Sequence, residues 1–138
     1  MSGLADALRA EHAAVFGYGV VGARLTGASA SAAKRAEAAH RKRRDVLLER
    51  LTAGKKKVPA AEPGYPLPFK VSDAGSAVKL AIHLEERTAG VWRATISATK
   101  GDDREFGVEA LIDCAIRASR WRTAAKAAPT VAFPGIDH

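Results

Sequence analysis

The chain has 138 residues, which is the length of one domain, and its 22 lysines and arginines against 15 acidic residues give a net charge of +7. This charge allows an anionic partner but does not require one. The single cysteine, Cys114, excludes an internal disulfide framework and fits a reducing compartment. The first turn carries Asp6 and Arg9 instead of an apolar signal segment, and the uncharged stretch 13–23 is far shorter than the ~20 residues that span a bilayer. We therefore expect a soluble, cytoplasmic protein with no membrane partner.

Two helices are predicted in the first part of the chain. The first begins behind the N-cap Ser2 and ends at Gly27, and the second begins near Ser29 or Ser31 and ends at Gly54. Steps of three and four residues place an apolar stripe on one face of the first helix. Its members are Leu4, Leu8, Val15, Tyr18, Gly22 and Leu25, and the second helix has Leu47, Leu48 and Leu51.

Residues 54–71 are predicted to be a crossover without helix, because four prolines and two glycines interrupt them. Loops of this length are uncommon in compact domains unless they have a task. Eighteen extended residues reach up to roughly 60 Å, whereas a 24-residue helix is ~36 Å long. The segment can therefore return the chain to the end of the bundle at which it started.

Two further helices follow the crossover. The third opens at Ser72 or Asp73 and ends at Gly101, and the fourth opens with a pattern close to a capping box, Asp102 to Glu105, and ends at Pro129. The residues predicted to face inward are Val78, Ile82, Ala89, Trp92 and Ile96 on the third helix, and Val108, Leu111, Ile112, Ala115 and Ser119 on the fourth. The tail 129–138 contains Val131, Phe133 and Ile136, so we expect it to lie on the bundle; exchange into the second subunit of a homodimer is the alternative.

The connections are short, long and short, which indicates an all-α four-helix bundle with one long crossover between the second and third helices. This is the connectivity of ferritin-like bundles. We expect one such domain over residues 1–138.

Charged residues interrupt the apolar stripes. Glu11 is in register with Leu4 and Tyr18, and Glu85 continues the stripe of the third helix, with Glu86 beside it. On the second helix the stripe drawn back from Leu51 passes through Arg44, His40 and Glu37. A lone carboxylate in a core is costly unless it is paired or coordinated, so these residues predict a polar layer.

The same residues resemble the ferritin-like superfamily, whose carboxylate metal proteins use Glu, Glu-x-x-His, Glu and Glu-x-x-His on successive helices. Here Glu11 is followed by the Glu-x-x-His of residues 37–40 and by Glu85 or Glu86, but Glu109 is followed by Ile112 where the last histidine would stand. More specifically, the chain is similar to a family of uncharacterised actinobacterial ferritin-like proteins. The segments that carry the likeness are 11–15, 18–25, 40–47, 84–92, 117–122 and 132–135. The resemblance implies a fold and no established activity.

Register arithmetic predicts which residues face one another. With turns centred near residues 28 and 101, Glu11 is level with Arg44, and Glu86 is level with Arg117. Because arginine stays charged and binds carboxylates through a bidentate fork, we interpret these residues as an ion-pair layer that replaces a metal cluster. The predicted layer consists of Glu11, Arg44, Glu86 and Arg117, with His40 and Asp113 nearby. A solvated charged face and a true metal site remain the alternatives.

The first hypothesis for function is a non-catalytic bundle that acts through interaction or as a scaffold, with no cofactor and an unknown partner. The second is an iron- or manganese-binding protein, a di-metal carboxylate oxidoreductase if it is an enzyme. Its ligands would be Glu11, Glu37, His40 and Glu85. A third is nucleic-acid binding through the basic clusters 41–44 and 55–57, which is disfavoured because successive residues of a helix point in different directions.

Overall fold

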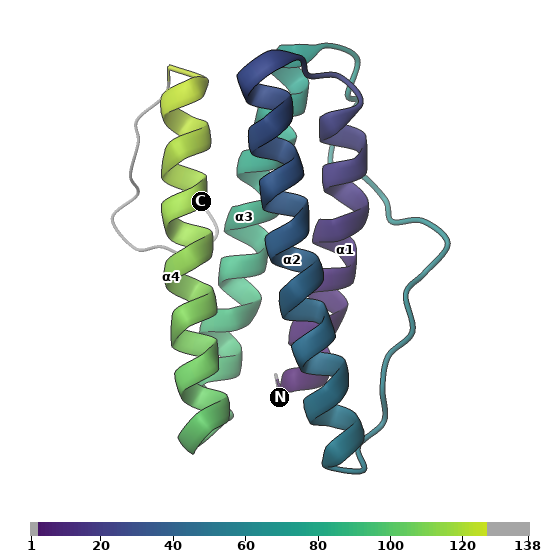
Figure 1. Ribbon diagram of the computed structural model, residues 1–138, viewed down its shortest axis with the longest axis vertical. Coiled ribbons are helices and arrows are strands. Elements are labelled where there is room, and N and C mark those ends of the chain that lie inside the picture. The colour runs from purple at the N-terminus through teal and green to yellow at the C-terminus, as the bar shows by residue number, and fades with distance from the viewer. Residues whose placement is uncertain (1–2, 127–138) are drawn as a thin grey trace.

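The computed structural model describes residues 3–126, and within them it contains four helices and no strand. The helices are α1 (Leu4–Gly22), α2 (Gly27–Ala53), α3 (Ala74–Ser97) and α4 (Gly101–Ala124). They lie side by side along one axis, with α1 and α4 running in one direction and α2 and α3 in the other (Figure 1). The predicted all-helical architecture with four helices is confirmed, and the tail 129–138 lies outside the described residues. No helix between residues 3 and 126 combines the length and apolar character needed to cross a bilayer.

Both short connections deliver the chain into the next helix through a glycine. Gly27 has a φ of 59° and Gly101 a φ of 57°, a left-handed conformation that glycine adopts without a steric penalty. The predicted capping box of α4 is wrong. The helix begins at Gly101 behind Lys100 and has no side-chain cap, so Asp102 lies inside the first turn, where its charge complements the helix dipole. The capping box is instead at α3, between Asp73 and Ser76.

The crossover between α2 and α3 is held against the bundle by aromatic and polar contacts. The His12 ring lies 3.2 Å from the carbonyl oxygen of Pro59, and the rings of Phe16 and Tyr65 are 5.6 Å apart. His12 is buried beneath this segment. Figure 1 shows the crossover passing outside α1 to reach the start of α3.

The buried apolar side chains form two separate clusters. One is built around Tyr18, Leu80 and Trp121, and the other around Leu8, Leu47 and Trp92. Along α1, Glu11 lies between Leu8 and Tyr18, and along α2, His40 lies between Ala36 of the first cluster and Leu47 of the second. The polar layer therefore divides the core near its middle.

The predicted inward face of α4 is also wrong. Val108 is 40% exposed and Ile112 is 53% exposed, while the buried positions carry smaller residues and one tryptophan. A Cβ at Gly107 would lie 3.2 Å from Ile96 and 3.4 Å from Trp92, so this small face lets α4 approach α3 closely. Packing between helices, and not the size of the apolar residues, selects the buried face. The buried residues of α4 are Gly107, Ala110, Cys114, Ala118 and Trp121.

Two glycines inside α1 provide a matched test of helix packing. A Cβ at Gly17 would lie 2.6 Å from both terminal methyl groups of the buried Leu84, whereas a Cβ at Gly19 would meet nothing within 4 Å. Both changes to alanine gain about the same helix propensity, up to ~1 kcal/mol. We expect Gly17→Ala to be less stable than Gly19→Ala by about 1–3 kcal/mol in urea unfolding, because only the first overpacks the core. Equal stabilities would contradict the close contact between α1 and α3.

Candidate functional site

The centre of the site is a buried histidine held between two buried carboxylates. His40 of α2 places Nδ1 2.5 Å from Glu11 Oε1 of α1 and Nε2 2.9 Å from Glu85 Oε2 of α3. All three residues are fully buried. One imidazole ring thus connects three helices.

Both ring nitrogens of His40 face acceptors, which favours the doubly protonated imidazolium. Burial alone would lower the pKa of His40, but the charge of Glu85 and the hydrogen bond and charge of Glu11 raise this pKa to about 9. Burial alone would raise the pKa of Glu11, but His40, Arg43 and Trp92 outweigh it and lower this pKa. The pair is therefore charged at neutral pH.

Aromatic donors add one further hydrogen bond to each of the two carboxylates. Trp92 Nε1 donates to Glu11 Oε2 at 2.8 Å, and the Tyr18 hydroxyl donates to Glu85 Oε2. Trp121 Nε1 donates to the Tyr18 hydroxyl at 2.9 Å. Burial, together with the charge of Glu85, raises the pKa of Tyr18 well above its ordinary value, so the hydroxyl keeps its proton. The buried indole N–H groups of Trp92 and Trp121 are therefore both hydrogen-bonded within this layer.

Two arginines flank the layer and share Asp113 of α4. Arg43 lies 3.2 Å from Glu11 Oε2 and 2.6 Å from Asp113 Oδ2. Arg117 lies 2.7 Å from Asp113 Oδ2 and 3.7 Å from Glu85 Oε1. Counted in their charged forms, the carboxylates of residues 11, 85 and 113 are balanced by His40 and the two guanidiniums. The network is electroneutral as it stands.

Cys114 lies beside the network without contributing a charge. It is fully buried, and Arg43 Nη1 lies 3.8 Å from its Sγ. Burial and the negative charges of Glu85 and Glu11 raise the pKa of the thiol well above its ordinary value. Neighbouring Glu85 Oε1 is the buried side-chain oxygen that has no hydrogen-bond partner within residues 3–126.

Three predicted members of the site lie elsewhere. Arg44 pairs with its neighbour Asp45 at 3.0 Å, Glu86 pairs with Arg122 at 2.6 Å, and Glu37 pairs with Arg41 at 2.7 Å. The predicted roles of Arg44 and Glu86 in the layer pass to residues 43 and 85. The side chain of Glu37 is 24% exposed and pairs outside the layer.

The cause of this shift is the position of the turns. The first turn occupies residues 23–26, so its centre lies before the predicted residue 28. The residue level with Glu11 is therefore closer to the start of α2, and His40 comes within reach of Glu11. The second turn, 98–100, also lies before residue 101, so Glu85 is level with Asp113, one turn before its cation Arg117. The structure places four of the predicted residues in the layer: Glu11, His40, Asp113 and Arg117.

Sequence reasoning missed Arg43 and Tyr18 as members of the layer. Tyr18 was placed on the apolar stripe only as a packing residue, although its spacing of seven from Glu11 put both on one face. Arg43 stands among four consecutive basic residues, and the pattern cannot tell which of them points inward. A signal was present for Tyr18 and none for Arg43.

The sequence matches a family described as a domain of unknown function, DUF4439, over residues 3–138. The chain belongs to this family. Its fold is similar to the crystal structure of a conserved hypothetical protein from Mycobacterium tuberculosis, with a TM-score of 0.84 and 39% sequence identity over 88% of this chain and 92% of that one. A search of curated proteins found no significant match.

Adjacent arginines of this DUF4439 chain allow a sharp test of the layer. Arg43→Met removes a cation from the buried Glu11 and should lower the free energy of unfolding by about 3 kcal/mol. Arg44→Met removes the same charge from a surface pair and should change it by less than ~1 kcal/mol. Chemical denaturation of both variants measures the difference. Equal losses, or a larger loss for Arg44→Met, would contradict the assigned network.

Stability should also depend on the protonation of His40. Because its folded pKa of about 9 lies above the ordinary 6.5, the stabilisation is complete below pH 6.5 and is lost as the pH rises toward 9. The free energy of unfolding should fall by on the order of 3 kcal/mol over this range.

Denaturant titrations at several pH values measure this fall, and His83→Gln, outside the network, should keep it while His40→Gln loses it. A ¹³C-detected NMR titration of the His40 ring in the unmodified protein gives an independent readout if the second variant does not fold. A His40 ring that titrates at or below pH 6.5 would rule out an imidazolium at neutral pH.

Proposed function

We propose that this protein is a non-catalytic bundle of ferritin-like arrangement that acts through interaction, with an ion-pair layer in the place of a metal centre. The observation that carries the proposal is the internal charge balance around His40. Three carboxylates meet three cations supplied by the protein itself: one imidazolium and two guanidiniums.

The residues present do not fit the iron or manganese centre that the ferritin-like resemblance implies. A metal ligand needs a free lone pair on its imidazole nitrogen, but both nitrogens of His40 point at carboxylate oxygens. A divalent ion on Glu11 would also lie near Arg43, which is 3.2 Å from the same carboxylate. Metal binding would therefore require loss of the His40 proton and displacement of a guanidinium.

Such a layer supports a structural role. Buried ion pairs add little net stability, because the desolvation of the charges offsets their attraction. They do penalise misaligned packing, since a shifted helix would leave a buried charge without its partner. Here the layer contacts all four helices, so it favours one register of the bundle.

The second candidate is metal binding at a different set of residues. His40, Glu85 and Cys114 offer three ligand atoms within 4.8 Å of one another, and Glu85 Oε1 has no hydrogen-bond partner in the described part of the chain. A thiolate and an imidazole would suit a softer ion such as zinc. This set keeps His40 and Glu85 of the predicted ligands, lacks Glu11 and Glu37, and adds Cys114.

Nucleic-acid binding receives less support from the geometry. The cluster 41–44 is divided: Arg41 pairs with Glu37, Arg43 turns into the core, and Arg44 pairs with Asp45. The four residues therefore do not present one basic patch for phosphates.

Metal analysis separates the first two functions. Protein produced in medium supplemented with iron, manganese and zinc, and purified without chelator, should contain far less than one metal ion per chain by mass spectrometry. Cys114→Ala, Glu11→Ala and the surface control Glu37→Gln should leave this content unchanged. Near-stoichiometric metal that is lost in Cys114→Ala or Glu11→Ala, but kept in Glu37→Gln, would overturn the proposal.

A further inference from the structure

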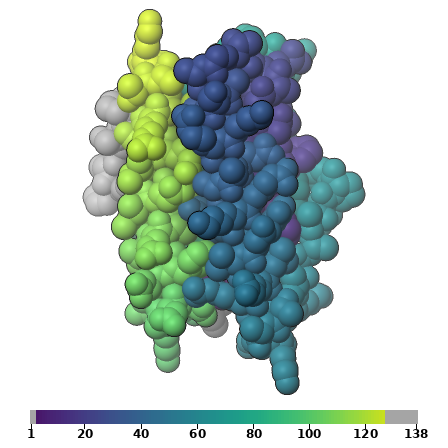
Figure 2. Space-filling model, in the orientation of Figure 1, coloured from purple at the N-terminus to yellow at the C-terminus, as the bar shows by residue number. Residues whose placement is uncertain are grey.

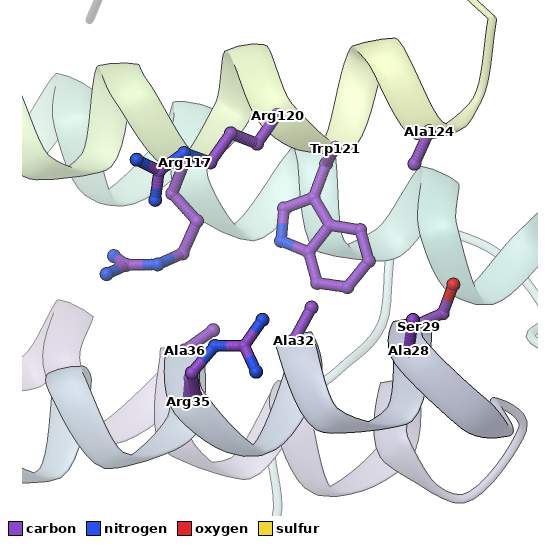
Figure 3. Close-up of a pocket in the computed structure, with 9 residues that line it drawn as sticks. All are labelled: Ala28, Ser29, Ala32, Arg35, Ala36, Arg117, Arg120, Trp121 and Ala124. Atoms are coloured by element: carbon purple, nitrogen blue, oxygen red, sulfur yellow. The ribbon is translucent and has the colours of Figure 1, made fainter.

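A pocket of about 370 Å³ opens between α2 and α4, near the end of the bundle where α2 begins and α4 ends. These two helices lie next to each other on the face seen in Figure 2. Alanines and one serine of α2 form one wall, and α4 forms the other (Figure 3). The residues that line it are Ala28, Ser29, Ala32, Arg35, Ala36, Arg117, Arg120, Trp121 and Ala124.

Three arginines and no acidic side chain line this pocket among the described residues. Arg35 reaches into the gap from α2 and Arg117 from α4, so cations approach from both walls (Figure 3). Arg117 is held by Asp113, whereas Arg35 and Arg120 form no ion pair with any residue in 3–126. Two guanidiniums therefore remain to bind an anion, and a third is already fixed in position.

An apolar surface adjoins these charges. The indole of Trp121 projects into the gap toward Ala32, and its N–H is bound to the Tyr18 hydroxyl at 2.9 Å. That hydrogen bond fixes the ring, so it offers a preorganised flat wall to a ligand. Apolar walls with a few placed polar groups are typical of small-molecule sites of this size.

We propose that this pocket binds a small organic phosphate, with the phosphate among Arg35, Arg117 and Arg120 and the organic group against Trp121 and the alanines. Guanidinium forks match phosphate oxygens in a bidentate geometry. The carbonyl end of α4 opposes an anion with only about half a charge, less than the two guanidiniums of Arg35 and Arg120 supply.

The pocket shares Arg117 and Trp121 with the buried layer, whose hydrogen bonds hold both side chains in place. Ligand binding in this pocket does not depend on whether the layer holds a metal. The experiment below therefore tests the pocket independently of the function proposed above.

The probe is phenyl phosphate. Inorganic phosphate and phenol, which each carry one of its two groups, are measured for comparison. The chain has two tryptophans, so an ¹H–¹⁵N spectrum shows two indole N–H signals. Phenyl phosphate should shift the Trp121 signal and not the Trp92 signal, and should bind more tightly than inorganic phosphate or phenol. Binding of inorganic phosphate with equal strength would overturn the role of Trp121, and binding of phenol with equal strength would overturn the role of the arginines.

Matched arginine variants locate the site. Arg35→Gln and Arg120→Gln should each weaken phenyl phosphate binding about tenfold, since each removes a charge-assisted contact. Arg93→Gln, which removes the same charge from an exposed position of α3, should change it less than twofold. Equal effects of all three variants would show non-specific attraction by the net charge, and the absence of any indole shift at millimolar phenyl phosphate would overturn the proposal outright.

Discussion

The hydrogen-bonded triad of Glu11, His40 and Glu85 is the constraint on which the rest of the bundle depends. It joins α1, α2 and α3 through one fully buried ring, and its charges are stable there only because each has a partner. The triad explains why aromatic N–H and O–H groups converge on the middle of the core instead of purely apolar packing. It also explains why Arg43 and Arg117 extend inward, since the two carboxylates carry one more negative charge than the imidazolium neutralises.

The layer and the helix contacts are adjusted to each other. Tyr18 and Trp121 belong to the apolar cluster on one side of the layer, and Trp92 belongs to the cluster on the other. Each of these residues packs with its ring and hydrogen-bonds with its polar tip. Small residues such as Gly17 and Gly107 then let the helices come close enough for the short polar contacts to form.

In our proposal the protein keeps the arrangement of a metal bundle but supplies the positive charge from its own side chains. The two kinds of charge are not equivalent. Guanidiniums remain charged at any relevant pH, whereas the imidazolium can lose its proton. The same network includes Arg117 and Trp121, which line the pocket between α2 and α4. A ligand in that pocket would contact the outer end of the buried layer directly.

The sequence by itself determined the four helices, the long crossover and the presence of buried charge, because helix periodicity, prolines and glycines act over a few residues. It also placed Glu11 and His40 in the core, since their spacing from apolar neighbours follows one helix face. Only the tertiary structure decided that Arg43 and Glu85, and not Arg44 and Glu86, complete the layer. Turns that lie a few residues earlier than predicted move the facing positions by about one to two helical turns, and neighbouring residues of a helix point ~100° apart. The buried face of α4 was likewise decided by contact with α3, because close approach selects small side chains that carry almost no apolar signal in a sequence.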